Sequence, residues 1–210
     1  RDDVESRGLG DVYKRQFPDC GGCMYQTMLY EEQLQMKANQ IKELLDAAIA
    51  GAGQVDEHGA PDYVFEGIKG SPKEFGYRNK MEFSFGDEYK DGPLSLGLHK
   101  KGSTYDVLTA ADCKIVHKDM TDILSSVLAF FKELDAPYYH KMSHEGYLRH
   151  LLLRRAETTG EILVHLVTSS QREYDLAPLV EQVLALPLEG KVVGFLHIIN
   201  LSLIHISEPT

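Results

Sequence analysis

Cysteine is scarce in this chain, and so are long apolar runs, which together exclude several classes of protein. The 210 residues contain three cysteines, and a small, odd number argues against the disulfide framework of a secreted domain. No apolar run approaches the roughly 18–20 residues that a membrane-spanning helix requires. Residues 1–7 are not followed by the apolar core of a signal peptide. We therefore expect a cytoplasmic protein with no membrane partner.

Basic residues are also in deficit, since 22 Lys and Arg stand against 32 Asp and Glu, for a net charge of −10. A general nucleic-acid coat is thereby disfavoured, because phosphate binding is driven by a basic surface. An RNA enzyme remains compatible with this charge if its basic residues gather on one face, or if its most basic domain is missing from this chain. The 43% hydrophobic share is ordinary for a globular chain, and the length suits one medium domain.

The two ends of the chain lack the periodicity of the rest. Residues 1–16 show no apolar stripe, and both ends resemble translated sequencing-adapter sequence, at residues 11–16 and 203–210. We expect non-native tails at 1–16 and 201–210, which leaves 17–200 as one central domain. Natural disordered tails are the alternative.

Between the tails, the hydrophobic pattern predicts helices alternating with strands. Helices are expected at 26–50, ended by Gly51 and Gly53, at 117–134 and at 176–186. The residues of the second helix that are expected to face inward are Met120, Ile123, Leu124, Val127, Leu128 and Phe131. Strands are expected at 64–69, 77–86, 94–99, 105–108, 148–156, 161–168 and 192–200. Strand pairs joined by turns, with about three helices among them, indicate an α+β fold on a largely antiparallel sheet.

The cysteines carry the sharpest chemical signal. Cys20 and Cys23 flank two glycines just before a predicted helix, and Cys113 stands far along the chain. Thiolates three residues apart can hold one zinc ion or iron–sulfur cluster, and glycines let the backbone pass close to it. A redox pair and inert buried thiols are the alternatives.

Basic side chains form three clusters in the sequence, on predicted strands and turns. Such clusters can contact RNA phosphates, and Tyr77 or Tyr105 can stack on an unpaired base. A solvated basic surface is the alternative interpretation. The clusters are Arg78, Asn79 and Lys80; His99, Lys100 and Lys101; and Arg149, His150, Arg154 and Arg155.

Two histidines four residues apart, His140 and His144, have the spacing of metal ligands on one helix face. Their surroundings, however, are those of a loop. A metal site there is disfavoured.

Several motifs in order resemble the RNA uracil-5-methyltransferase family, which includes enzymes that modify ribosomal RNA. The resemblance covers about Phe17 to Asn200 and keeps the order and spacing of the family. The motifs are Cys20–Gln26, Gly76–Phe83, Leu96–Ser103, Asp112–Ile115, Leu148–Leu151 with Arg154, and Thr159–Val164.

The resemblance implies a 4Fe-4S cluster bound by Cys20, Cys23, Cys113 and a fourth cysteine six residues before Cys20. Lys14 occupies that position, inside the expected tail. The implied partner is RNA, expected to be ribosomal RNA, and no DNA partner is expected. The residues expected to contact it are Arg78, Asn79, Lys80, Lys100 and Arg149.

The family's catalytic domain follows the resembling segment and is doubly wound. It binds S-adenosylmethionine and carries a cysteine nucleophile, which attacks uracil C6, and a glutamate base. No cysteine follows Cys113 here. We therefore expect this chain to have no catalytic residues and no activity alone. A stand-alone iron–sulfur module, such as an electron carrier, or a zinc-binding module is the alternative.

Overall fold

The computed structural model describes residues 19–25 and 27–200, which fall into two compact units. The first comprises 19–22 and 75–200, and the second comprises 23–74 apart from residue 26. The expected tails at 1–16 and 201–210, and with them Lys14, lie outside the described residues.

Helix α1, Tyr30–Gly51, is the main element of the second unit. The carboxylate of Glu32 accepts the backbone N–H of Leu29 at 3.1 Å, which satisfies a donor that has no partner within the helix. The helix ends at the glycine signal read from the sequence, and Gly53 follows with a φ of 77°. No residue of α1 is buried, so its apolar stripe stays largely exposed.

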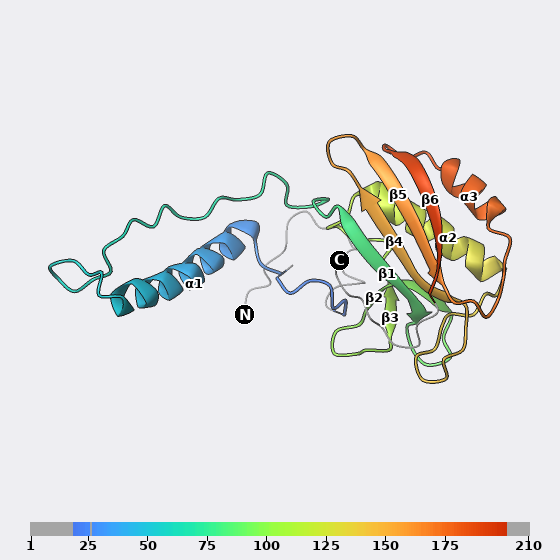
Figure 1. Cartoon of the computed structure of the whole chain (residues 1–210), viewed down its shortest axis with the longest axis horizontal. Helices are drawn as coiled ribbons and strands as arrows, with labels where there is room; N and C mark the ends of the chain where they lie inside the picture. Colours follow the sequence, from blue (N-terminus) through green and yellow to red (C-terminus); the bar gives the residue numbers. More distant parts are fainter. Residues whose placement is uncertain (1–18, 26, 201–210) are drawn as a thin grey trace, which may run out of the picture. The chain divides into compact units, whose positions relative to one another are not determined.

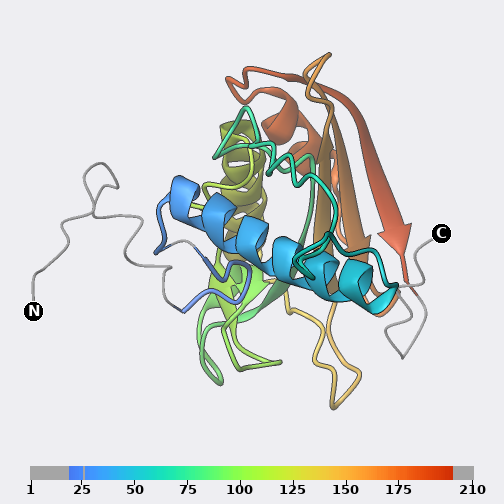
Figure 2. The ribbon, with the colours of Figure 1, turned by 90° about the vertical axis from the view of Figure 1, so that its left-hand side faces the viewer.

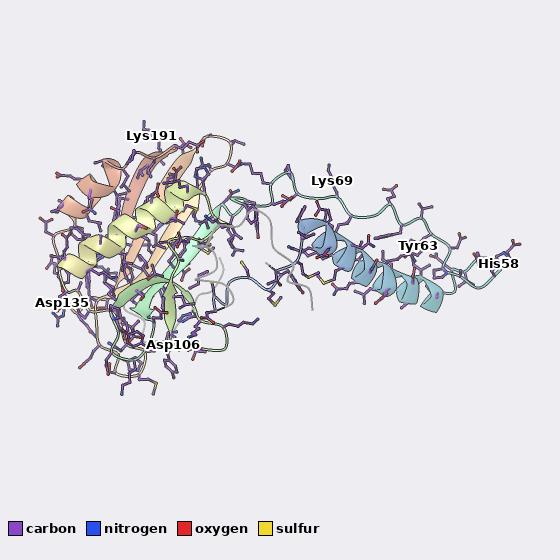
Figure 3. All side chains as sticks on the ribbon, turned by 180° about the vertical axis from the view of Figure 1, so that it is seen from behind. His58, Tyr63, Lys69, Asp106, Asp135 and Lys191 are labelled. Carbon is purple, nitrogen blue, oxygen red and sulfur yellow. The ribbon has the colours of Figure 1, made fainter. Side chains whose placement is uncertain are left out.

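Polar contacts hold the segment after α1 against that helix. The Tyr63 hydroxyl donates to Asp46 Oδ1 at 2.6 Å, and Lys42 Nζ lies 2.7 Å from Asp46 Oδ2. Farther along, the Tyr30 hydroxyl accepts the backbone N–H of Ser71 at 2.6 Å. Figure 3 labels Tyr63 and shows it beside α1. This unit is therefore held by hydrogen bonds and ion pairs along one helix.

The strand predicted at residues 64–69 is wrong. No regular structure forms there; Val64 is 86% exposed, and Gly67 has a φ of 94°. A strand needs a neighbour to complete its hydrogen bonds. The described part of the second unit contains no strand that could serve as one.

A six-stranded sheet forms the first unit, in the order β3-β2-β1-β4-β5-β6 (Figure 1). Neighbouring strands are antiparallel, except that β5 and β6 are parallel. The strands are β1 Lys80–Asp87, β2 Leu94–His99, β3 Val107–Thr109, β4 Leu148–Arg155, β5 Glu161–Thr168 and β6 Lys191–Ile199. The predicted α+β class is confirmed, and the predicted spans of β2 and β5 match fully.

Helices α2, Lys118–Glu133, and α3, Ala177–Leu184, lie on one face of the sheet, as Figures 1 and 2 show. The inward-facing residues predicted for α2 are all buried, namely Met120, Ile123, Leu124, Val127, Leu128 and Phe131. Fully buried strand residues, such as Phe83 and Leu151, complete this core. Among the described residues, no helix has both the length and the apolar character needed to cross a bilayer.

The other face of the sheet carries polar and half-buried side chains. Glu82 is exposed, and Leu152, its partner in the β1–β4 register, is half-buried, as is His165 on β5. Strand side chains alternate between faces, so the neighbours of the core residues point to this second face. Polar groups of β1 and β4 are therefore available there.

Candidate functional site

The Cys-Gly-Gly segment docks against the end of β2. Cys20 forms an isolated antiparallel bridge with Lys100, and the N–H of Gly21 donates to the carbonyl of His99 at 3.0 Å. A Cβ atom on Gly21 would lie 2.9 Å from that carbonyl oxygen. Only glycine fits without a shift of the backbone, which explains the residue type beside Cys20.

Cys113 lies in the loop that follows β3, in the same unit as Cys20. Burial raises the pKa of the Cys113 thiol, whereas the backbone N–H groups of Ile115 and Val116 lower it. The thiol of Cys20 raises the pKa of Cys113 further, and the guanidinium of Arg78 lowers it. The fold thus brings Cys20 and Cys113 into one neighbourhood despite their separation in sequence.

The donors around these thiols suit thiolate ligands. The N–H of Gly22 donates to Cys20 Sγ at 3.4 Å, as the backbone N–H groups do near Cys113. Hydrogen bonds to sulfur stabilise thiolates bound to iron–sulfur clusters. Cys23 is the first residue of the other unit. Within the described ranges, however, no group of three or more metal-ligating side chains is assembled.

The first basic cluster borders Cys113. Arg78 is exposed; its backbone N–H donates to Ile115 O at 2.9 Å, and its Nε donates to Lys80 O at 3.2 Å. Lys80 begins β1 and pairs with Arg154 of β4. Two cations opposite each other in a sheet repel. An anionic ligand would relieve that repulsion.

The remaining predicted contacts divide between the surface and the interior. Asn79 is exposed, and its carbonyl accepts the N–H of Arg155 at 2.8 Å. Lys100 is half-buried at the bridge to Cys20. Arg149 is only 4% exposed, and its guanidinium lies 4.4 Å from the centre of the Tyr139 ring. Arg149 therefore lies inside the fold, where it forms part of the wall of a pocket.

That pocket has a volume of about 90 Å³ and lies in the first unit. Its walls are the end of β1, the loop before β3, the hairpin that precedes β4 and the start of β4. Burial lowers the pKa of His99 in its wall, as does the positive charge of Lys141, whereas the carbonyl and charge of Asp106 raise it. Sequence reasoning missed the hairpin residues; the signal was the run Tyr138-Tyr139-His140-Lys141, aromatic and basic within a loop.

His140 and His144, the pair with metal-ligand spacing, lie in this hairpin and not on a helix. The backbone N–H of His144 donates to the carbonyl of His140 at 2.9 Å, and His144 has a φ of 58°. The side chain of His144 contacts the Tyr139 hydroxyl at 3.2 Å. The two histidines therefore shape a tight turn.

Known proteins share both the sequence and the fold, although no protein-family model matches the chain. It is 44% identical over 187 residues to an RNA methyltransferase of Clostridium tetani and 42% identical over 185 residues to one of Clostridium acetobutylicum. Over this segment, the chain is a homologue of RNA methyltransferases. The resemblance drawn from the motifs is thereby confirmed at the level of RNA methyltransferases. These matches cover 89% and 88% of this chain but only 39% and 38% of the two relatives.

A solved structure shares the fold of a large part of this chain. The chain superposes with a TM-score of 0.54 on Pyrococcus abyssi tRNA (uracil-54, C5)-methyltransferase in complex with S-adenosyl-L-homocysteine. The match covers 78% of this chain and 34% of that one, at 23% sequence identity. The likeness establishes a common fold for the matched part.

Proposed function

We propose that this chain is the cluster-binding and RNA-contacting part of an S-adenosylmethionine-dependent RNA uracil-5-methyltransferase. The observation that carries the proposal is the 44% identity to an RNA methyltransferase over 187 residues. The fold shared with a tRNA uracil-C5 methyltransferase supports uracil C5 as the modified position. The sequence motifs favour ribosomal RNA as the substrate.

The RNA-contacting surface of the proposal consists of Arg78, Asn79, Lys80 and Lys100. Arg78 and Lys80 are exposed, and Lys80 faces Arg154 across the sheet. These cations lie where a phosphate backbone would relieve their mutual repulsion. Their location beside Cys113 and Cys20 links this surface to the cysteine site.

Cys20, Cys23 and Cys113 are the proposed ligands of a 4Fe-4S cluster. A cluster there would staple the loop after β3 to the Cys-Gly-Gly segment, since thiolate ligation adds stability to a loop-rich region. The N–H groups of Gly22, Ile115 and Val116 supply hydrogen bonds to the sulfurs. The proposed domain spans residues 17–200.

Methyl transfer requires residues beyond these. All three cysteines of the sequence are assigned to the cluster, so none is left to attack uracil C6. We expect no transfer when the purified chain is mixed with radiolabelled S-adenosylmethionine and a uridine-containing RNA. Labelled RNA would show that the nucleophile is among the residues assigned here to the scaffold.

RNA binding is the direct test of the proposed function. Fluorescence anisotropy with a labelled RNA stem-loop should give binding that weakens steeply as salt rises. The double variant Arg78→Ala/Lys80→Ala should bind more weakly and with a flatter salt dependence. Lys90→Ala/Lys132→Ala is the matched control, since it removes two exposed cations that belong neither to this surface nor to the cysteine site. Equal RNA affinities of the wild type and the Arg78→Ala/Lys80→Ala variant would exclude this surface as the RNA-binding site.

A zinc-binding module is the second candidate, because zinc uses the same thiolates. Anaerobic reconstitution with iron and sulfide separates the two. A brown protein containing both iron and acid-labile sulfide supports the cluster, and a colourless protein containing tightly bound zinc supports the alternative. Cys20→Ser and Cys113→Ser should each reduce the retained metal.

A further inference from the structure

The pocket beneath the hairpin has the dimensions of a small ligand site. Its volume of about 90 Å³ is several times the roughly 10–15 Å³ that a cavity needs in order to hold one water molecule. One flat ring, or a few waters, therefore fits inside. No part of the cysteine site or of the Arg78–Lys80 surface lines it.

Aromatic faces form part of the pocket wall. Tyr105, from the loop before β3, is 62% exposed, and its hydroxyl lies 3.9 Å from the sulfur of Met142 in the hairpin. On the hairpin, the Tyr139 ring carries the guanidinium of Arg149 at 4.4 Å. Tyrosine rings and guanidinium planes are the surfaces on which unpaired bases stack.

Polar groups in the same wall suit a ligand that has both donors and acceptors. His99 Nδ1 is buried and has no hydrogen-bond partner among the described residues. A buried polar atom without a partner costs free energy, which a ligand atom would recover. Lys141 adds a positive charge to the pocket. The carboxylate of Asp87, also in the wall, is engaged by the Tyr138 hydroxyl.

The hairpin that carries these groups is held in place before any ligand arrives. Gln171 Oε1 accepts the N–H of Gly146 at 2.8 Å, and Gln171 Nε2 donates to the carbonyl of His144. The hydroxyl of Ser169 donates to Gly146 O at 2.6 Å. A wall that is already ordered loses little entropy on binding.

These features narrow the class of ligand. An apolar molecule would leave Nδ1 of His99 without a hydrogen-bond partner, and a divalent cation would be repelled by Lys141 and Arg149. A simple anion would leave the tyrosine rings unused. A nucleotide, with an aromatic base, polar ring edges and a phosphate, matches all three kinds of group.

We propose that this pocket binds one unpaired nucleotide of the RNA substrate, with its base against Tyr105 and Tyr139 and its phosphate near Lys141. The inference rests on the proposed function, because the nucleotide is supplied by RNA bound to this domain. The pocket would bind a base, in addition to the phosphate contacts proposed for Arg78, Lys80 and Lys100. Such a site helps to select a particular loop or bulge of the RNA.

Calorimetric titration of the full chain with uridine monophosphate, uridine and ribose 5-phosphate tests the pocket without RNA. Uridine monophosphate should bind at least about tenfold more tightly than the other two, since each lacks one recognised group. Tyr105→Ala should weaken the binding of uridine monophosphate about tenfold. Tyr105→Phe should retain the affinity, because it keeps the aromatic ring. Lys141→Gln should weaken the binding of uridine monophosphate but not that of uridine.

Matched controls come from the turn between β1 and β2. Tyr89 is 61% exposed and Lys90 is exposed, and neither lines the pocket. Tyr89→Ala and Lys90→Gln should leave binding unchanged. Unaltered binding by the Tyr105→Ala and Lys141→Gln variants would overturn the proposal. Equal affinities for ribose 5-phosphate and uridine monophosphate would also overturn it, since the pocket would then be an anion site.

Photo-crosslinking distinguishes RNA from free nucleotide as the source of the ligand. A single-stranded RNA containing 4-thiouridine should crosslink to peptides that contain Tyr105 or Tyr139, and Tyr105→Ala should reduce this product. Crosslinks confined to the Arg78–Lys80 segment would overturn the pocket proposal and leave the proposed function intact. Binding of free uridine monophosphate without any pocket crosslink would overturn the RNA source.

Discussion

Arg155 Nε donates to Asp119 Oδ2 at 3.1 Å, which ties the end of β4 to the first turn of α2. Both side chains are nearly buried, at 9% and 4% exposure. The same carboxylate accepts the N–H groups of Glu189 and Gly190, each at 2.9 Å, from the turn before β6. One carboxylate therefore joins a helix, a central strand and the approach to an edge strand.

Removing this carboxylate should be costly. Asp119→Ala leaves the buried Arg155 with the more distant carboxylate of Glu157, at 3.8 Å, and removes the acceptor of two backbone N–H groups. We therefore expect about 3 kcal/mol lower free energy of unfolding. Urea denaturation followed by circular dichroism measures it. Asp122→Ala is the matched control, since its ion pair with Lys118 is more exposed and should contribute less than about 1 kcal/mol. Similar losses in both variants would contradict a special role for Asp119.

The same group predicts an acid dependence of stability. Burial by itself raises the pKa of Asp119, and the hydrogen bonds from the backbone N–H groups of Glu189 and Gly190 lower it. Arg155 and His117 also lower the pKa of Asp119, which ends below its ordinary value of 3.8. The stability that the Asp119 carboxylate contributes is therefore fully present above its pKa in the unfolded chain, near 3.8. It is lost as the pH falls through the lower pKa of Asp119 in the folded protein.

The measurement is the free energy of unfolding between pH 6 and about pH 2.5. The wild type should lose stability in the acid part of this range. Asp119→Asn should start from a lower stability and show a flatter acid limb, because the titrating group is gone. Parallel curves for the two proteins would assign the acid loss to other carboxylates.

Strand β6 should promote self-association. Leu196 and Ile198 are 43% and 40% exposed on this edge strand, and exposed apolar edges favour pairing with other chains. Ile198→Lys should lower the apparent mass at high concentration in light scattering. Leu184→Lys is the control, since it changes an exposed leucine on α3 and should have the smaller effect. A larger effect of Leu184→Lys than of Ile198→Lys would place the contact between molecules on the helices.

Iron retention tests the position of the fourth ligand. Lys14→Cys should increase the iron held after anaerobic reconstitution and desalting, because four thiolates bind a 4Fe-4S cluster more firmly than three. Arg15→Cys is the matched control, since it adds a thiol one residue out of register. Equal retention by both variants would exclude the register drawn from the family resemblance.

Local pattern was sufficient to predict much of the fold. The alternation of apolar residues predicted β5 with its bounds, and the stripe from Met120 to Phe131 predicted which side of α2 is buried. The wrong strand at 64–69 has the same origin, because an alternating pattern indicates extended backbone but does not supply a neighbouring strand.

The candidate site was less accessible to sequence reasoning. The cysteines were identified by spacing and resemblance, but only the fold places Cys113 near Cys20. Arg149 was predicted to contact RNA because it lies in a basic cluster of the sequence. Its packing on Tyr139 depends on how the hairpin folds against β4. Contacts between distant segments of this kind leave no periodic signal in the sequence.

The parallel pairing of β5 with β6 has a consequence for the order of folding. Strands β1 to β2, β2 to β3 and β4 to β5 are antiparallel neighbours in sequence, so each pair can form by closing a loop between consecutive elements. Strand β6 must instead wait until residues 169–190, with α3, have crossed the sheet. We expect β6 to join last and to detach first, so that its amides exchange with solvent deuterium while those of β4 remain protected.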